Sequence, residues 1–159
     1  RAGIKAIFTQ EIKVLTLIFI DIDHFKPIND NHGHAVGDKV LVSLVKLVSE
    51  NCRVSDFLAR WGGEEFLLVC PNTNLDEAYE LAESLRLLIE NVDWENDIKM
   101  SASFGVAQRM DESTAEAIER ADKALYDAKA RGRNRVVLSK KERVSDKSSL
   151  ERRQANTKV

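Results

Sequence analysis

The stretch that decides the fold runs from Phe57 to Cys70 and reads Phe-Leu-Ala-Arg-Trp-Gly-Gly-Glu-Glu-Phe-Leu-Leu-Val-Cys. Two apolar, strand-like runs flank a Gly-Gly pair at positions 62 and 63. Glycine readily adopts the positive φ angles that tight, primed hairpin turns need. The sequence therefore predicts a tight β-hairpin with strands over 57–61 and 64–70.

A second buried strand is expected before the hairpin. Residues 14–20 are rich in β-branched and aromatic side chains, and this run ends abruptly at Asp21. Asp23 is placed to cap a short helix that begins at His24, and Gly33 is placed to end it.

Helices and strands then alternate along the chain. Apolar residues at three- and four-residue intervals predict three more amphipathic helices, over 40–48, 78–89 and 118–128. The pairs Asn74 with Glu77 and Ser113 with Glu116 have the spacing of capping boxes, which open helices. Two further strands are expected over 98–107 and 135–138.

This order of elements, with one more helix expected before residue 14, indicates an α+β fold. A strand, a helical crossover and a returning hairpin form the split βαβ arrangement, in which the second hairpin strand lies beside the first strand and antiparallel to it. The end of the first strand, at Asp21, should then meet the start of the second hairpin strand, at Glu64. We expect these carboxylates to be neighbours although they are distant in sequence.

Composition narrows the class of protein. The chain has 159 residues, a formal net charge of −2, 43% hydrophobic residues and 31% charged residues, as expected for one globular domain. Its longest apolar run, residues 14–20, is far shorter than the span of about 20 residues that a membrane helix needs. We also expect no secretory leader.

The two cysteines, Cys52 and Cys70, do not have the spacing of a zinc site, and a reducing compartment is expected.

The last twenty residues differ in composition from the rest. Residues 140–159 hold seven Lys or Arg against three Asp or Glu and few large apolar side chains, so we expect a charged, flexible tail. With the total at −2, its net charge of +4 leaves −6 on residues 1–139. That acidic body argues against a nucleic-acid surface.

Four carboxylates are predicted to approach one sheet edge, with Lys26 nearby: Asp21, Asp23, Glu64 and Glu65. So much negative charge is unfavourable without a cation, and oxygen ligands favour Mg²⁺. A simpler interpretation makes Asp23 a helix cap and the two glutamates exposed hairpin acids. The pattern alone leaves both open.

Other binding motifs are weak. The chain has neither a P-loop nor a dinucleotide fingerprint. Its three histidines, at 24, 32 and 34, have no well-spaced fourth ligand for zinc. Lys129 and Arg133 flank Gly132 and can hold phosphates, although cations at a helix C-terminus are also common for dipole reasons.

A family resemblance connects these features. Trp61–Phe66 resembles the signature of the GGDEF family of diguanylate cyclases, in its Gly-Gly-Glu-Glu-Phe form. Other segments match the family in the same order: 21–26, 29–30, 33–34, 37–38, 103–107, 121–122 and 132–134. The resemblance covers about residues 1–138. It implies a palm-like fold, shared with nucleotidyl cyclases, with a mostly antiparallel sheet flanked by helices, and the condensation of two GTP into cyclic di-GMP with release of pyrophosphate.

The resemblance also implies catalytic roles. Asp21, Glu64 and the Ile22 carbonyl match the family's metal ligands, for Mg²⁺ or Mn²⁺ with two ions per active site. Glu64 matches the base for the 3′-hydroxyl, and Glu65 completes the acidic signature.

Substrate contacts are implied as well. Asn29 and Asp38 match the pair that reads guanine, although a helix-end cap and a first-turn acid are alternative readings. Seven residues match the family's nucleotide-holding positions: Phe25, Lys26, His34, Gly62, Gly63, Lys129 and Arg133. Phe25 can equally be part of the core.

A regulatory site is implied by Arg53-Val-Ser-Asp56, which has the placement of the family's inhibitory site for cyclic di-GMP. Arg60 is a further candidate contact there. Arg53 and Asp56 can otherwise pair with each other, for under about 1 kcal/mol.

The resemblance implies partners too: GTP, cyclic di-GMP as product and inhibitor, a second copy of the domain, and an upstream sensory or receiver domain. The chain begins at what resembles the last Arg of an upstream family turn. The domain is expected in the cytoplasm, within a full-length protein that can be membrane-attached.

Two alternatives to this function are a non-catalytic nucleotide-binding domain and a polymerase-like palm. A non-catalytic domain has no need of the acidic signature that this chain carries. A polymerase-like palm predicts a basic groove, whereas residues 1–139 carry a net charge of −6.

Overall fold

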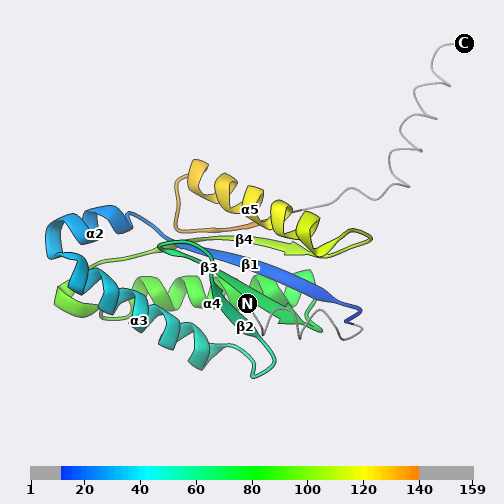
Figure 1. Cartoon of the computed structure of the whole chain (residues 1–159), viewed down its shortest axis with the longest axis horizontal. Helices are drawn as coiled ribbons and strands as arrows, with labels where there is room; N and C mark the ends of the chain where they lie inside the picture. The colour runs from blue at the N-terminus through cyan, green and yellow to red at the C-terminus, as the bar shows by residue number, and fades with distance from the viewer. Residues whose placement is uncertain (1–11, 140–159) are drawn as a thin grey trace, which may run out of the picture.

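The computed structural model describes residues 12–139, which form a five-stranded sheet with helices on both faces (Figure 1). The strands are β1 (Leu15–Ile22), β2 (Phe57–Arg60), β3 (Glu65–Pro71), β4 (Ala102–Gln108) and β5 (Val136–Leu138). The helices are α2 (Phe25–His32), α3 (His34–Asn51), α4 (Leu75–Asn91) and α5 (Thr114–Ala130), with a 3₁₀ turn at Glu95–Asp97.

The strand order is β2-β3-β1-β4-β5, so β1 is the central strand. It pairs antiparallel with β3 on one side and with β4 on the other, and only the β4–β5 pair is parallel. The mostly antiparallel α+β fold predicted from the sequence is confirmed. The C-terminal end of β1 therefore lies beside the N-terminal ends of both β3 and β4.

β1 is buried along its whole length because helices cover both of its faces. Ile18, Ile20 and Ile22 belong to the core on the side of α3 and α4. Leu17 and Phe19 belong to the smaller core beneath α5. A strand covered on both faces needs apolar residues at nearly every position, which explains the continuous apolar run seen in the sequence.

The predicted helices form with the expected buried stripes. In α4, the Asn74 side chain accepts from the Glu77 N–H while the Glu77 side chain accepts from the Asn74 N–H, a complete capping box. In α5, the Ser113 side chain accepts from the Glu116 N–H. Gly33, at φ 86°, ends α2 as predicted, in a conformation that glycine adopts easily.

Several local predictions are wrong. Asp23 does not cap α2, because the N-cap is His24 in a left-handed conformation without a side-chain cap. Neither glycine of the pair 62–63 has a positive φ, so the hairpin does not use a primed turn. Instead, the N–H groups of Trp61 and Gly62 both donate to the Glu65 carbonyl, which closes a wider loop.

The start of β4 also differs from the prediction, and two predicted segments lie outside the described residues. Residues 98–101 precede β4 rather than belonging to it, because the 3₁₀ turn and an irregular segment come first. The helix expected before residue 14 and the tail at 140–159 lie outside the described residues. Within residues 12–139, none of the helices has the length and hydropathy that a membrane span requires.

Gly105 provides a test of the sheet–helix packing. A Cβ on this β4 residue would lie 2.2 Å from the Leu125 nitrogen and 2.3 Å from the Ala121 carbonyl oxygen, both in the α5 backbone. Because backbone atoms cannot rotate away, Gly105→Ala should lower the free energy of unfolding by about 2–3 kcal/mol, measured by urea denaturation. Gly63→Ala is the matched control, since nothing lies within 4 Å of its Cβ position. Equal stability of both variants would contradict this packing.

Candidate functional site

The site forms where β1 ends and β3 begins. Asp21 pairs in register with Glu65, and the Ile22 N–H donates to the Glu64 carbonyl at 3.3 Å. The topological prediction that Asp21 and Glu64 would be neighbours is confirmed. Strand pairing, rather than sequence proximity, brings these acids together.

A pocket of about 230 Å³ opens at this edge. Its lining combines acidic and basic residues from β1, α2, the hairpin and the end of α5: Asp21, Ile22, Asp23, His24, Phe25, Lys26, Pro27, Glu64, Lys129 and Arg133. Most of the residues singled out for metal and phosphate binding therefore share one cavity, but Glu65, His34 and the two hairpin glycines do not line it. Because the Ile22 side chain is part of the core, its backbone is what faces the pocket.

Asp21 is held in the pocket by a cation. Its side chain is only 8% exposed, and the Lys129 ammonium group lies 2.6 Å from its Oδ2. Burial raises the pKa of Asp21, and the nearby charges of Glu64 and Asp23 raise it further, whereas Lys129 opposes the shift. Negative charge at this position thus depends on a positive partner.

The cations come from the end of α5. Lys129 lies in the last turn of that helix, and Gly132, at φ 115°, reverses the chain after it. Arg133 follows with a left-handed φ of 64° and an exposed side chain. Both residues line the pocket, as phosphate-binding groups would.

The acids do not all converge as predicted. Asp23 is turned toward β4, where its carboxylate accepts hydrogen bonds from Ser101, Ser103 and the Asn134 backbone. Glu65 is absent from the pocket lining, and its pKa is raised by burial, then by the charges of Asp122 and Asp21. Glu64 is the last hairpin residue before β3 and lines the pocket, whereas Glu65 is the first residue of that strand and pairs in register with Asp21.

Asn29 and Asp38 come together where α2 and α3 meet. The Asn29 side chain packs against Gly37, where a Cβ would collide with its Oδ1 at 1.8 Å, and Asp38 is the next residue. Asp38 is exposed in the second turn of α3 rather than in its first turn. His34 is the exposed first residue of the same helix and does not line the pocket.

Phe25 and Lys26 start α2 at the pocket. Phe25 is 8% exposed and belongs to the core, and it also lines the cavity. Its role in holding the nucleotide stays a prediction. Lys26 is exposed and pairs with Asp30 at 3.5 Å. An exposed pair of this kind is weak, so the Lys26 ammonium is available to an anion.

Arg60 has a role in the hairpin that sequence reasoning missed. Its guanidinium donates to the carbonyls of Gly62 and Gly63, at 3.2 and 2.7 Å. These contacts fix the glycine-rich loop. Arg60 is also absent from the pocket that contains Arg53 and Asp56.

That second pocket has a volume of about 390 Å³ and lies at the end of α3. The Arg53 N–H donates to Asp56 Oδ2 at 2.8 Å, and its guanidinium pairs with Glu77 at 3.0 Å. The other oxygen of Asp56, Oδ1, is buried without a hydrogen-bond partner, and burial raises the pKa of this carboxyl. Thr73, which is also part of the lining, was not singled out in the sequence.

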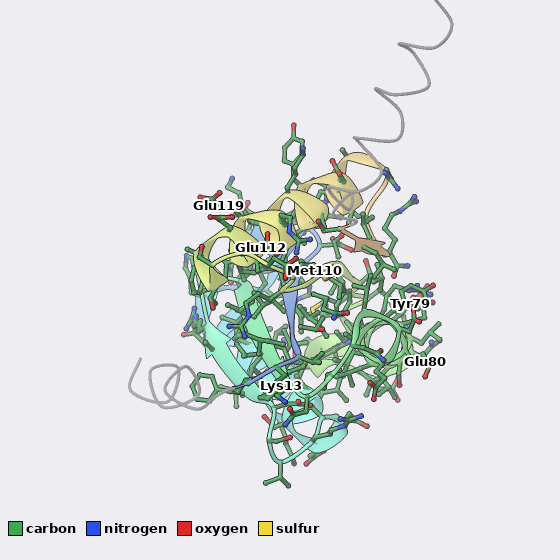
Figure 2. The ribbon with its side chains drawn as sticks, turned by 90° about the vertical axis from the view of Figure 1, so that its right-hand side faces the viewer. Lys13, Tyr79, Glu80, Met110, Glu112 and Glu119 are labelled. Carbon is green, nitrogen blue, oxygen red and sulfur yellow. The ribbon has the colours of Figure 1, made fainter. Side chains whose placement is uncertain are left out.

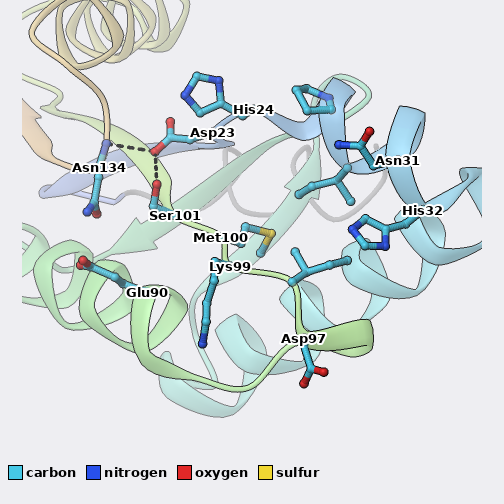
Figure 3. Close-up of a pocket in the computed structure, with 13 residues that line it drawn as sticks. Asp23, His24, Asn31, His32, Glu90, Asp97, Lys99, Met100, Ser101 and Asn134 are labelled. Atoms are coloured by element: carbon cyan, nitrogen blue, oxygen red, sulfur yellow. Dashed lines mark hydrogen bonds between the residues drawn. The ribbon is translucent and has the colours of Figure 1, made fainter.

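A third pocket, of about 610 Å³, lies between α2, the end of α4 and the start of β4 (Figure 3). Asp23, Ser101 and Asn134 form one of its walls. Within residues 12–139, no group of three or more His, Cys, Asp or Glu side chains has metal-site geometry.

Residues 4–135 match the family described as diguanylate cyclase, GGDEF domain. The chain belongs to the GGDEF family. Diguanylate cyclase A of Treponema denticola is 44% identical over 136 residues, which cover 82% of this chain and 37% of that protein. Diguanylate cyclase DgcM of Escherichia coli K12 is 45% identical over 78% of this chain and 30% of that protein. The chain thus spans about a third of the curated GGDEF relatives it matches.

Solved GGDEF structures agree with the fold. The active GGEEF domain of a diguanylate cyclase from Vibrio cholerae is 36% identical, with a TM-score of 0.80 over 89% of this chain and 92% of that chain. The GGDEF domain of DgcB from Caulobacter crescentus, in complex with c-di-GMP, is 33% identical, with a TM-score of 0.75 over 79% of this chain and 78% of that chain.

The Asp21–Lys129 pair predicts a pH-dependent stability. Lys129→Met leaves a buried carboxylate without its cation, and because Lys129 is 35% exposed we expect a modest loss at pH 7, about 1–2 kcal/mol in the free energy of unfolding. Without Lys129, the folded-state pKa of Asp21 lies further above its unfolded value. The penalty therefore applies above that pKa and is relieved as the pH falls through it.

Urea denaturation of Lys129→Met at pH 7 and at successively lower pH measures this effect. Lys123→Met, which removes an exposed cation of α5, is the control and should change stability little at any pH. A loss in Lys129→Met that stays constant across the pH range would contradict the account.

Proposed function

We propose that this chain is the catalytic domain of a diguanylate cyclase, which condenses two GTP into cyclic di-GMP and releases pyrophosphate. The observation that carries the proposal is the shared pocket, in which Asp21 and Glu64 face Lys129 and Arg133. Acids and cations in one cavity suit the transfer of a nucleotidyl group to a 3′-hydroxyl with release of pyrophosphate. A non-catalytic nucleotide-binding domain would not need this paired acidity, and an acidic body does not suit a nucleic-acid polymerase.

The donor set fits a divalent metal ion. Asp21, Glu64 and the Ile22 backbone offer oxygen ligands, which Mg²⁺ and Mn²⁺ prefer, and the raised pKa of Asp21 marks a need for nearby positive charge. Diguanylate cyclases of this family are generally metal-dependent, and we propose two ions per site. When bound, such ions lower the pKa of a hydroxyl and stabilise the leaving pyrophosphate.

The chain's own residues then have distinct tasks. Glu64 accepts the proton of the attacking 3′-hydroxyl, while Lys26, Lys129 and Arg133 hold the triphosphate by charge-assisted hydrogen bonds. The Lys129 ammonium has three N–H donors, so it can contact a phosphate oxygen while it stays near Asp21.

Guanine recognition is assigned to the junction of α2 and α3. The amide of Asn29 and the carboxylate of Asp38 offer a donor and acceptors suited to the guanine edge, and His34 lies close by in sequence. The lack of a Cβ at Gly37 leaves the space that the Asn29 side chain occupies. Glu65, Gly62 and Gly63 shape the loop beside the nucleotide, with Arg60 fixing its carbonyls.

The reaction requires two such domains. One site has a single guanine-reading pair, whereas the product contains two nucleotides, each joined through the other's 3′-hydroxyl. A two-fold symmetric dimer supplies the second nucleotide in line with the first. An upstream sensory or receiver domain would control how the two domains meet.

Replacing either central acid tests the catalytic assignment. Glu64→Gln and Asp21→Asn each remove one negative charge at constant size, so product formation should fall by more than about 10²-fold, measured as cyclic di-GMP formed from GTP and Mg²⁺. Glu119→Gln is the matched control, because Glu119 is exposed on α5 (Figure 2), ten residues before Lys129, and does not line the pocket. Turnover near that of the unmodified protein in either acid variant would refute the assignment.

We also propose that the Arg53–Asp56 pocket binds cyclic di-GMP and slows the enzyme. The buried Oδ1 of Asp56 supports this: it has no partner at hydrogen-bond distance, and the Cys70 thiol beside this carboxyl is only a weak donor, so a ligand N–H would satisfy it better. A guanine N–H edge is a suitable donor, and Arg53 can offer a forked pair of N–H groups to guanine or phosphate.

Product titration tests this second site. In Arg53→Ala, the cyclic di-GMP concentration for half-inhibition should rise by about tenfold or more, because a charge-assisted pair of hydrogen bonds is lost, while the initial rate stays unchanged. Lys123→Ala, an exposed cation outside the pocket, should leave inhibition unchanged. If the unmodified protein neither binds the product away from the active site nor slows with it, this proposal fails and the catalytic one stands.

A further inference from the structure

Asp23 has an unusual set of partners for a residue beside an active site. It is only 5% exposed, and its carboxylate accepts three hydrogen bonds. Those from Ser101 and Asn134 are drawn in Figure 3. Ser103 Oγ donates to Oδ1 at 2.6 Å, while Ser101 Oγ and the Asn134 backbone N–H donate to Oδ2, at 2.7 and 3.0 Å. The Asp23 N–H also donates to the Ser101 carbonyl at 2.9 Å.

These bonds join three segments that are distant in sequence. Asp23 follows directly on Asp21 and Ile22 at the end of β1, Ser101 and Ser103 lie at the start of β4, and Asn134 precedes β5. One buried carboxylate therefore connects the acidic side of the proposed active site to the loop that carries Arg133.

That loop needs such a connection. Arg133 and Asn134 both have left-handed backbones, at φ 64° and 44°, which are unfavourable for non-glycine residues unless the surroundings hold them. The Arg133 N–H donates to the Ala128 carbonyl at 3.0 Å, and the Asn134 N–H donates to Asp23. Asp23 thus holds the backbone of the half of the loop that helix α5 does not, while the Arg86 guanidinium donates to the Asn134 side chain at 3.0 Å.

We propose that Asp23 is a positioning residue, which holds the Arg133 loop in register with Asp21 and Glu64. The proposal rests on the proposed function, in which Arg133 binds the triphosphate. Asp23 itself need not touch metal or substrate, because all of its described hydrogen bonds are used within the fold. Its effect on the reaction passes through Arg133.

The chemistry of the partners distinguishes two substitutions. Asp23→Ala removes every side-chain acceptor. Asp23→Asn can keep the geometry, since its oxygen can accept from Ser101 and Asn134 while its NH₂ group donates to Ser103 Oγ. Loss in the alanine variant with rescue in the asparagine variant is expected from positioning by hydrogen bonds rather than from the negative charge.

A double-mutant cycle with Arg133→Ala tests the proposal. Asp23→Ala should lower kcat/KM for GTP by about 10–100-fold, mainly through KM, because a misplaced clamp weakens binding. In the Arg133→Ala background, Asp23→Ala should lower kcat/KM little further, because the effects of two coupled residues do not add. The same cycle is measured as affinity for a non-hydrolysable GTP analogue with Mg²⁺, which does not depend on turnover.

A control separates positioning from loss of stability. Thr16→Val removes a buried hydrogen bond to the Thr73 carbonyl at the other end of β1, so it should lower the unfolding temperature without changing KM. If Asp23→Ala does not fold, Ser103→Ala replaces it in the cycle, because it removes one of the three donors.

The outcomes are distinct. The positioning role would be overturned if the fold-losses of Asp23→Ala and Arg133→Ala multiply in the double variant, in both activity and affinity. It would also be overturned if Asp23→Asn is as impaired as Asp23→Ala. If the unmodified protein binds the GTP analogue but forms no cyclic di-GMP, the proposed function fails. Non-additive affinities would still support the role of Asp23 in holding Arg133.

Discussion

The central position of β1 is the constraint on which the rest of the structure depends. Both neighbours of β1 run antiparallel to it, so its C-terminal end meets the first residues of β3 and of β4. Helices cover both faces, which requires eight buried residues in succession. A polar group at the end of such a strand, here Asp21, is held at a fixed place against the hairpin acids. The acidic site follows from the topology of the sheet.

Charge balance then shapes the pocket around that strand end. Burial disfavours a charged Asp21, and Lys129 from the end of α5 compensates at 2.6 Å. Three hydrogen bonds turn the Asp23 carboxylate toward the start of β4, so fewer acids face one another at the end of β1. Of the three acids that line the pocket, Asp23 is hydrogen-bonded toward β4, which leaves Asp21 and Glu64 beside several cations, a balance suited to a metal–triphosphate complex rather than to an isolated metal ion.

The sequence predicts most of the fold because the signals are local. Apolar spacing and the Asn74–Glu77 capping box locate the helices, and the apolar run before Asp21 locates β1. The neighbourhood of Asp21 and Glu64 is also predictable, since it follows from the split βαβ order. The hairpin turn is not, because the Arg60 guanidinium fixes the carbonyls of residues 62 and 63. The role of Asp23 is equally hidden, because its partners lie 78 or more positions away. Serines at alternate positions where β4 starts are the one signal that points to it.

The central claim is that this pocket converts GTP into cyclic di-GMP. Mass analysis of the products formed from GTP and Mg²⁺ by the purified full-length protein, over a series of protein concentrations, tests it most directly. The account predicts cyclic di-GMP and pyrophosphate, with a rate per subunit that rises with concentration as two domains meet. GTP that remains intact at every concentration, or is converted only to GDP, would contradict it.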